Sequence, residues 1–167
     1  FDAGVTAADP YRAVARHVGV EQGAMIVSDK EYQLQDYQRI VVVGAGKASA
    51  RMAQALEDLL GNRISCGIIN VKHRYSVPLA GISVNEASQP LPDEAGLRGA
   101  RAIADLARQT NNGDLVFCLI SGGGSALLPA PADGITLEEK VRTTGILLDW
   151  GATKQEMNAV RKHISKL

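Results

Sequence analysis

The stretch Arg39–Arg51, RIVVVGAGKASAR, joins an apolar run to a helical pattern through two glycines. Ile40–Val43 is β-branched and does not alternate between apolar and polar residues, which is typical of a strand covered on both faces. A helix is expected from about Lys47 to Leu60, where Gly61 ends it. Four side chains are expected on its inner face: Ala48, Met52, Ala55 and Leu59. A buried strand that turns through a glycine corner into a helix is the repeating unit of a parallel α/β sheet.

The rest of the chain repeats this alternation. Further strands are expected at Ile64–Val71, Gly81–Glu86 and Asp114–Ile120, and a short strand or loop is expected around Ala24–Val27. Further helices are expected from Pro10 to Val18, from Asp93 to Gln109, through Ser125–Leu128, and after the capping boxes Thr136-x-x-Glu139 and Thr153-x-x-Glu156. Right-handed crossovers between such units predict one three-layer α/β/α, Rossmann-like domain over residues 1–167, with a mostly parallel sheet. Asp114–Ile120 is expected to be a central strand.

Composition narrows the functional classes. The chain has 167 residues, 46% hydrophobic and 22% charged, and its formal net charge is zero. A neutral chain with only 4% aromatic residues lacks the clustered positive charge and the stacking surface that nucleic-acid binding requires. No apolar run is long enough to span a bilayer. We therefore expect no nucleic-acid or membrane partner and a cytoplasmic location.

The two cysteines, Cys66 and Cys118, both lie in apolar runs that resemble strands. We expect both to be buried, reduced thiols. They have no C-x-x-C spacing and no histidine cluster nearby, so the sequence predicts no metal site.

The first glycine corner, GAGKAS, has the features of an anion site. Gly44 and Gly46 allow a sharp turn and the close approach of a ligand. The helix that follows is expected to present free backbone N–H groups and a partial positive charge. Lys47 stands at that positive end, where a lysine is unfavourable unless a bound anion compensates it. We therefore predict that Lys47 is functional, and a surface lysine without a specific role is the alternative.

Two nucleotide-binding motifs fail at this corner. A Walker A loop would need glycine at position 41 and Ser or Thr at position 48, where Val41 and Ala48 stand. A G-x-G-x-x-G fingerprint would need glycine at position 49, where Ser49 stands. No acidic residue ends the next strand near Asn70 to hold a ribose. Dinucleotide binding is therefore disfavoured.

The second corner, SGGGSALL, begins at Ser121 and follows another buried run. Three consecutive glycines are costly in chain entropy, and a simple turn needs fewer. With the hydroxyls of Ser121 and Ser125 beside it, this loop can form a nest of N–H groups for a phosphate or carboxylate. A flexible loop with Ser125 as a helix cap is the alternative. A nucleophilic serine is disfavoured because the G-x-S-x-G elbow would need glycine where Leu127 stands.

Two further segments carry polar groups of interest. Asp93, in QPLPDE, either caps a helix or orients a substrate or a metal-bound phosphate. Asn158 and Arg161, in NAVRKH, lie on one helix with Lys162 and His163. They form either a solvated basic face or groups that position and neutralise phosphates.

Several segments together resemble one family, the two-domain, MOFRL-associated glycerate 2-kinases, in their amino-terminal domain. These segments are, in order, GAGKASARMA, QPLPDEAGLRGA, LISGGGSALLPAP and GATKQEMNAVRKHISKL. The resemblance covers nearly the whole chain, and members are sometimes named hydroxypyruvate reductases. Members are considerably longer. The resemblance therefore implies that this chain is most of a first domain, and that a second α/β domain, absent from it, completes an active site in the cleft between the two.

The resemblance implies that ATP phosphorylates D-glycerate at the 2-hydroxyl, giving 2-phosphoglycerate and ADP, with Mg²⁺ as the cation. It implies catalytic roles for Lys47 and Arg161, and binding roles for Asn158 and the loop Ser121–Ser125. With the candidates from the sequence pattern added, the expected binding residues are Gly44, Gly46, Asp93, Ser121, Gly122, Gly123, Gly124, Ser125 and Asn158.

One residue departs from the family pattern. Members usually have histidine before the first proline of the P-x-P-D-E motif, where this chain has Gln89. Glutamine keeps hydrogen bonding but does not change charge near neutral pH. The substitution therefore matters if the histidine acts as an acid or base, and matters little if it only positions groups.

Two other functions stay open at this point. One is a non-catalytic module that binds a sugar phosphate or organic acid, because such modules use similar glycine–serine loops. The other is an NAD(P)H-dependent hydroxypyruvate reductase, which the failed dinucleotide fingerprint disfavours. Glycerate and ATP are the expected small-molecule partners, and a homodimer is possible.

Overall fold

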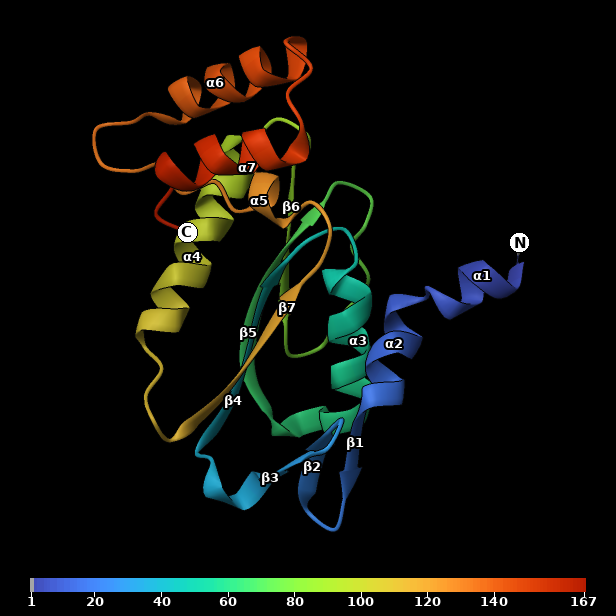
Figure 1. The fold of residues 1–167 in the computed structure, drawn as a ribbon. Coiled ribbons are helices and arrows are strands. Elements are labelled where there is room, and N and C mark those ends of the chain that lie inside the picture. Colours follow the sequence, from blue (N-terminus) through green and yellow to red (C-terminus); the bar gives the residue numbers. More distant parts are fainter. Residues whose placement is uncertain (1) are drawn as a thin grey trace.

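The computed structural model describes residues 2–167, and its centre is a four-stranded parallel sheet (Figure 1). The strand order is β6-β5-β4-β7, and each neighbouring pair is parallel. The strands are β4 (Arg39–Ala45), β5 (Ile64–Lys72), β6 (Ser83–Ala87) and β7 (Asp114–Ile120). The order reverses at β4, because β5 and β6 lie on one side of it and β7 lies on the other. In open α/β sheets, ligands bind beyond the carboxyl ends of the strands at such a switch point.

Helices cover both faces of this sheet, which confirms the predicted three-layer α/β/α class. α3 (Ser49–Leu60) packs on one face, and α2 (Pro10–His17) packs outside it, preceded by α1 (Asp2–Ala7). α4 (Glu94–Arg108) packs on the other face (Figure 1). The unbroken apolar run of β4 follows from this arrangement. Val42 belongs to the core cluster beneath α3, and Val43 packs with Ile103 of α4.

β7 lies at the edge of the sheet, so its prediction as a central strand is wrong. α4 covers β4, β5 and β6 and leaves the same face of β7 open. Val116 is 40% exposed and Ile120 is 55% exposed on that face. Cys118 lies between them and is also exposed, so the expectation of two buried thiols fails for it; Cys66 is partly buried.

The predicted inner face of α3 is confirmed in part: Ala55 is buried, and Met52 and Leu59 pack partly buried against the main core, whereas Ala48 is the N-cap residue. The buried residues on it include Ser49, Ala53, Leu56 and Leu60. The helix begins at Ser49 rather than Lys47, and its first residue is buried because Ser49 Oγ donates a hydrogen bond to the Leu119 carbonyl oxygen (2.9 Å). A polar side chain therefore occupies a core position that an apolar pattern does not reveal.

Residues 18–33 form a three-stranded antiparallel meander where only a short strand or a loop around Ala24–Val27 was expected. Its strands are β1 (Val18–Glu21), β2 (Ala24–Val27) and β3 (Lys30–Gln33). The turns use Gln22, Gly23 and Ser28 with positive φ. Short 3-10 turns follow at η1 (Leu34–Asp36) and η2 (Gly61–Arg63). The meander contributes Met25 to the main core and lies at the end of the sheet away from the glycine corners (Figure 1).

Three helices complete the chain above the carboxyl ends of the strands (Figure 1): α5 (Gly124–Leu127), α6 (Leu137–Asp149) and α7 (Lys154–His163). Both predicted capping boxes, at Thr136 and Thr153, are formed. Lys140 of α6 is buried and donates to the Ile164 carbonyl oxygen at the end of α7 (3.2 Å), which ties the two helices together. None of the helices within residues 2–167 has the length and apolar character needed to cross a membrane.

Candidate functional site

The two glycine corners are in direct contact. The backbone N–H of Lys47 donates to the Gly122 carbonyl oxygen (3.1 Å), and that of Ala48 donates to Ser121 Oγ (3.0 Å). Gly46 has φ +141°, and a Cβ there would overlap Ser121 Oγ. The contact follows from the topology, because β4 and β7 are parallel neighbours and their carboxyl ends coincide. The expected convergence of the corners is therefore present.

The first corner does not offer the free backbone N–H groups that were expected of it. The N–H of Gly46 donates to the Asn70 carbonyl oxygen (3.0 Å), and the N–H groups of Lys47 and Ala48 are used by the second corner. Gly44 lies inside β4, where a Cβ would stand 3.0 Å from Leu119 Cβ. The two glycines thus permit close packing between chain segments, and only the exposed side chain of Lys47 is available to a ligand.

The second corner does carry free N–H groups. Among the hydrogen bonds of residues 2–167, none uses the backbone N–H of Gly122, Gly123 or Ser125. Gly123 has φ +95° and stands at the N-cap of α5, where no side chain caps the helix. Ser125 is therefore not the helix cap. Successive free N–H groups around a left-handed residue form a concave nest for an anion.

A crevice of about 740 Å³ opens over these corners. It brings together eight of the predicted site residues: Lys47, Ser121, Gly122, Gly123, Gly124, Ser125, Asn158 and Arg161. Lys154, at the start of α7, adds a third cation that the sequence reasoning missed. Its signal was the one used for Lys47, a lysine at the positive end of a helix. Neither Asp nor Glu is among the residues that line the crevice.

The electrostatics of the crevice favour an anion. Arg161 is partly buried, and burial lowers the pKa of its guanidinium. Lys140 does not line the crevice; it is 2% exposed, and its pKa is lowered first by burial and then by the charge of Arg161. No ion pair within residues 2–167 gives either cation a carboxylate partner. Since desolvated charges are unfavourable unless paired, a bound anion would relieve this cluster.

Asp93 does not line the crevice. Its Oδ1 accepts from the backbone N–H of Gly96 (2.8 Å) and caps α4, and its Oδ2 lies 3.7 Å from His73 Nε2. These contacts match the capping interpretation of Asp93. Its role as a ligand-binding carboxylate stays a prediction.

The crevice also does not fit a magnesium ion by itself. Mg²⁺ prefers carboxylate and water oxygens in an octahedral arrangement, and no carboxylate lines the crevice. Within residues 2–167, no group of three or more His, Cys, Asp or Glu side chains could hold a metal ion.

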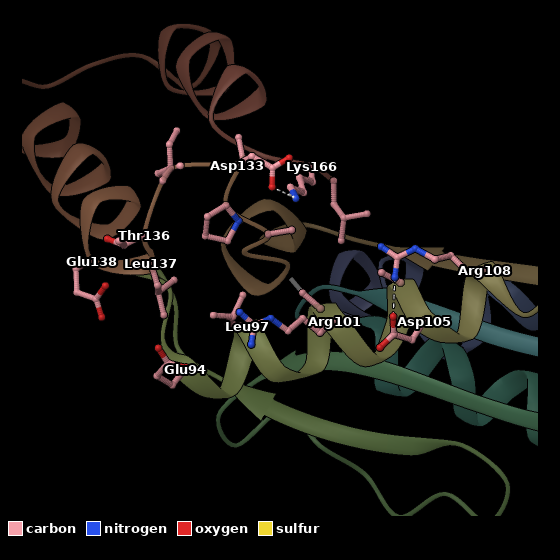
Figure 2. A pocket seen from close by; sticks show the side chains of 18 residues that line it. Glu94, Leu97, Arg101, Asp105, Arg108, Asp133, Thr136, Leu137, Glu138 and Lys166 are labelled. Atoms are coloured by element: carbon pink, nitrogen blue, oxygen red, sulfur yellow. Dashed lines mark hydrogen bonds and ion pairs between the residues drawn. The ribbon is translucent and has the colours of Figure 1, made fainter.

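A second cavity of about 670 Å³ lies along α4, between this helix and the segment that follows α5 (Figure 2). Four of its seven charged side chains are paired within the chain, because Lys166 contacts Asp133 and Arg108 contacts Asp105. Neither glycine corner contributes to its lining. The crevice over the corners is therefore the stronger candidate site.

Fold and crevice together define a Rossmann-like α/β domain with a cationic, glycine-lined site at the switch point of its sheet. The chain belongs to the family whose model is described as "Domain of unknown function (DUF4147)", which matches residues 1–167. It is 43% identical, over 98% of its own length and 36% of the relative's, to a protein of Pyrococcus horikoshii named glycerate 2-kinase. The resemblance to glycerate kinases is thereby confirmed.

Solved structures agree with this assignment. A crystal structure of a Pyrococcus horikoshii OT3 protein superimposes with a TM-score of 0.86 at 44% identity, covering 96% of this chain and 36% of that one. The crystal structure of glycerate kinase from Thermotoga maritima gives 0.78 at 34% identity, covering 99% and 37%. The chain therefore spans little more than a third of the length of these relatives.

Proposed function

We propose that the protein containing this chain is a D-glycerate 2-kinase, which transfers the γ-phosphoryl group of ATP to the 2-hydroxyl of D-glycerate. One observation carries the proposal. The loops after β4 and β7 converge on a crevice with free N–H groups and three cations but no carboxylate, in a chain similar to proteins named glycerate kinase. Such a site suits the negative charge that phosphoryl transfer brings together, because this chemistry depends on positioning and charge stabilisation.

The proposed transfer forms one bond and breaks one. The 2-hydroxyl oxygen of glycerate forms a bond to the γ-phosphorus, and the bond from that phosphorus to the β,γ-bridging oxygen breaks. ADP leaves with the electron pair of the broken bond, and the hydroxyl proton passes to solvent or to a base outside this crevice. The products are 2-phosphoglycerate and ADP.

Each residue of the crevice has a role in this transfer that follows from the chemistry of its side chain or backbone. The side chain of Lys47 makes no hydrogen bond or ion pair within residues 2–167, and we assign it the stabilisation of charge on the transferred group. The N–H groups of Gly122 and Gly123 hold a phosphate or the substrate carboxylate. Asn158 and Arg161 project from α7 into the same crevice and orient the anion. Mg²⁺ belongs to the proposal as the partner of ATP, but its protein ligands would have to come from outside this crevice.

The remainder of the protein is proposed to supply the other wall. The relatives are nearly three times as long as this chain, so each has further residues that could complete the crevice. We therefore expect residues 1–167 alone to bind anions weakly and to show no turnover.

The test is a coupled kinase assay on the intact parent protein. D-glycerate and ATP should give ADP and a phosphate ester, and proton-coupled phosphorus NMR should place the ester on carbon 2. An ester on carbon 3 would refute the regiochemistry. Oxidation of NADPH or NADH by hydroxypyruvate without ADP formation would favour a reductase. Binding of glycerate without turnover would favour a non-catalytic module.

A further inference from the structure

Gln89 has a buried acceptor that nothing within residues 2–167 satisfies. It lies in the loop between β6 and α4 and lines the crevice beside the second glycine corner. Its Oε1 is the one buried side-chain oxygen or nitrogen within residues 2–167 that has no hydrogen-bond partner. A buried acceptor without a donor is costly, and native structures keep few of them.

The same domain satisfies its other buried amides. Asn70, at 0% exposure, donates to the carbonyl oxygens of Gly96 (3.2 Å) and Leu127 (2.7 Å). Its Oδ1 accepts from Asn85 Nδ2 (3.0 Å), which also donates to the Ala95 carbonyl oxygen (3.0 Å). The unpaired amide is therefore particular to the crevice wall, where a ligand can supply the missing donor.

Packing holds the Gln89 amide at this wall. A Cβ on Gly123 would stand 2.9 Å from both the amide carbon and Oε1 of Gln89, so the amide lies against the Gly123 backbone. Glycine therefore suits position 123 for two reasons: its backbone has φ +95°, and a side chain there would overlap the amide of Gln89. The terminal torsion of glutamine is soft, so the amide can turn its oxygen towards the crevice while the stem stays packed.

Resting on the proposed function, we propose that Gln89 is a specificity residue that accepts a hydrogen bond from the non-reacting hydroxyl of the hydroxy-acid substrate. The cations Lys47, Lys154 and Arg161 meet the charged groups of the ligands, so a neutral amide among them suits a neutral hydroxyl. Gln89 does not titrate near neutral pH and so does not deprotonate the attacking hydroxyl. A site that hydrogen-bonds a hydroxyl rejects the analogue that lacks it, because its polar group is then left unpaired.

The test compares D-glycerate with D-lactate, which has the same 2-hydroxyl and carboxylate but no 3-hydroxyl. Dissociation constants for both acids are measured by calorimetry on the full-length protein, for the wild type and for Gln89→Met, which keeps the length of the side chain and removes its polar atoms. The wild type should bind D-glycerate more tightly than D-lactate. The substitution Gln89→Met should lower the ratio of the affinity for D-glycerate to the affinity for D-lactate at least about tenfold. For each variant that phosphorylates D-lactate, the ratio of kcat/KM for D-glycerate to kcat/KM for D-lactate is measured as well.

Thermal unfolding separates this role from a structural one. Because Oε1 has no partner within residues 2–167, Gln89→Met should unfold at the same temperature as the wild type or higher. The comparison variant Asn85→Leu removes a bonded amide and should lower the unfolding temperature. An unchanged affinity ratio, or destabilisation of Gln89→Met to the extent of Asn85→Leu, would overturn the inference. A wild type that neither binds nor phosphorylates D-glycerate would instead overturn the proposed function.

Discussion

The contact between the two corners can be tested with the substitution Gly46→Ala. The added Cβ would overlap Ser121 Oγ and stand 2.8 Å from the Ser121 carbonyl oxygen, at a φ of +141° that side chains rarely adopt. Overpacking of this kind costs about 1–3 kcal/mol, and the unfavourable backbone conformation costs a further 1–3 kcal/mol or so. Alanine recovers roughly 0.4–1 kcal/mol by restricting the unfolded chain. The net expectation is a loss of about 3 kcal/mol in the free energy of unfolding.

The matched control is Gly122→Ala, in the opposite corner. A Cβ on Gly122 would meet nothing within 4 Å, and Gly122 does not have a positive φ. Its stability should therefore stay the same or rise by up to roughly 1 kcal/mol.

Urea unfolding of the full-length protein, followed by circular dichroism, measures both variants. With an m-value of about 2 kcal/mol/M, Gly46→Ala should lower the midpoint by roughly 1.5 M, and Gly122→Ala should leave it in place. Gly46→Ala should also lose phosphoryl transfer, because the displaced Ser121 separates Lys47 from the glycine loop. If the two variants unfold at the same urea concentration, the corners are not packed together and the geometry of the crevice is wrong.

Four further outcomes are expected. Lys47→Ala should lower kcat at least about tenfold, equivalent to roughly 1.4 kcal/mol of barrier, without a change in unfolding; an unchanged kcat would remove Lys47 from the mechanism. Arg161→Met should raise the KM for ATP or glycerate several-fold. Its unfolding midpoint should stay the same or rise, because the substitution removes a desolvated cation that has no carboxylate partner. A clear loss of stability would reveal a partner within the fold. Asp93→Ala should lower stability by about 1 kcal/mol, whereas Asp93→Asn keeps the cap; a loss of turnover in Asp93→Asn at wild-type stability would assign the carboxylate to the ligand. Hydrogen bonds from Arg39 lower the pKa of Asp114 below its ordinary value of 3.8, so the pair stabilises the fold above that pH and this stability is lost as the pH falls through the lowered pKa. The free energy of unfolding of Asp114→Asn should therefore fall less steeply with decreasing pH in that range. The same dependence on pH in the variant and the wild type would contradict the assignment.

The strands and helices around the two corners could be predicted because the sequence patterns that mark them are local. Apolar runs without alternation mark strands buried on both faces, and the capping boxes at Thr136 and Thr153 mark where α6 and α7 begin. The convergence of the corners follows from one further rule, that parallel strands present their carboxyl ends at the same edge. Lys47 and the loop Ser121–Ser125 could therefore be predicted to lie together, whereas the resemblance to the family was needed to assign Asn158 and Arg161 to the site.

The errors lie where the deciding partner is distant in sequence or the signal is weak. The meander has strands of four residues and turns at Gln22 and Ser28, where no proline or Asn-Gly pair marks them. The exposure of Cys118 depends on strand order, which hydropathy along one strand does not encode. Asp93 illustrates a third limit, because its capping role and a ligand role require the same residue at the same position.

The first corner shows why a loop sequence does not by itself establish an anion site. GAGK followed by a helix predicted free N–H groups, but the acceptors that use those groups come from β5, Ser121 and Gly122, far away in the chain. The second corner keeps its N–H groups free because β7 is the edge strand, and no further strand of residues 2–167 lies beside it to supply acceptors. The same edge position that leaves Val116 and Ile120 exposed thus leaves the nest at Gly122 and Gly123 open. Within this domain the two corners divide the work: the first positions Lys47, and the second supplies the backbone groups that can hold the anion.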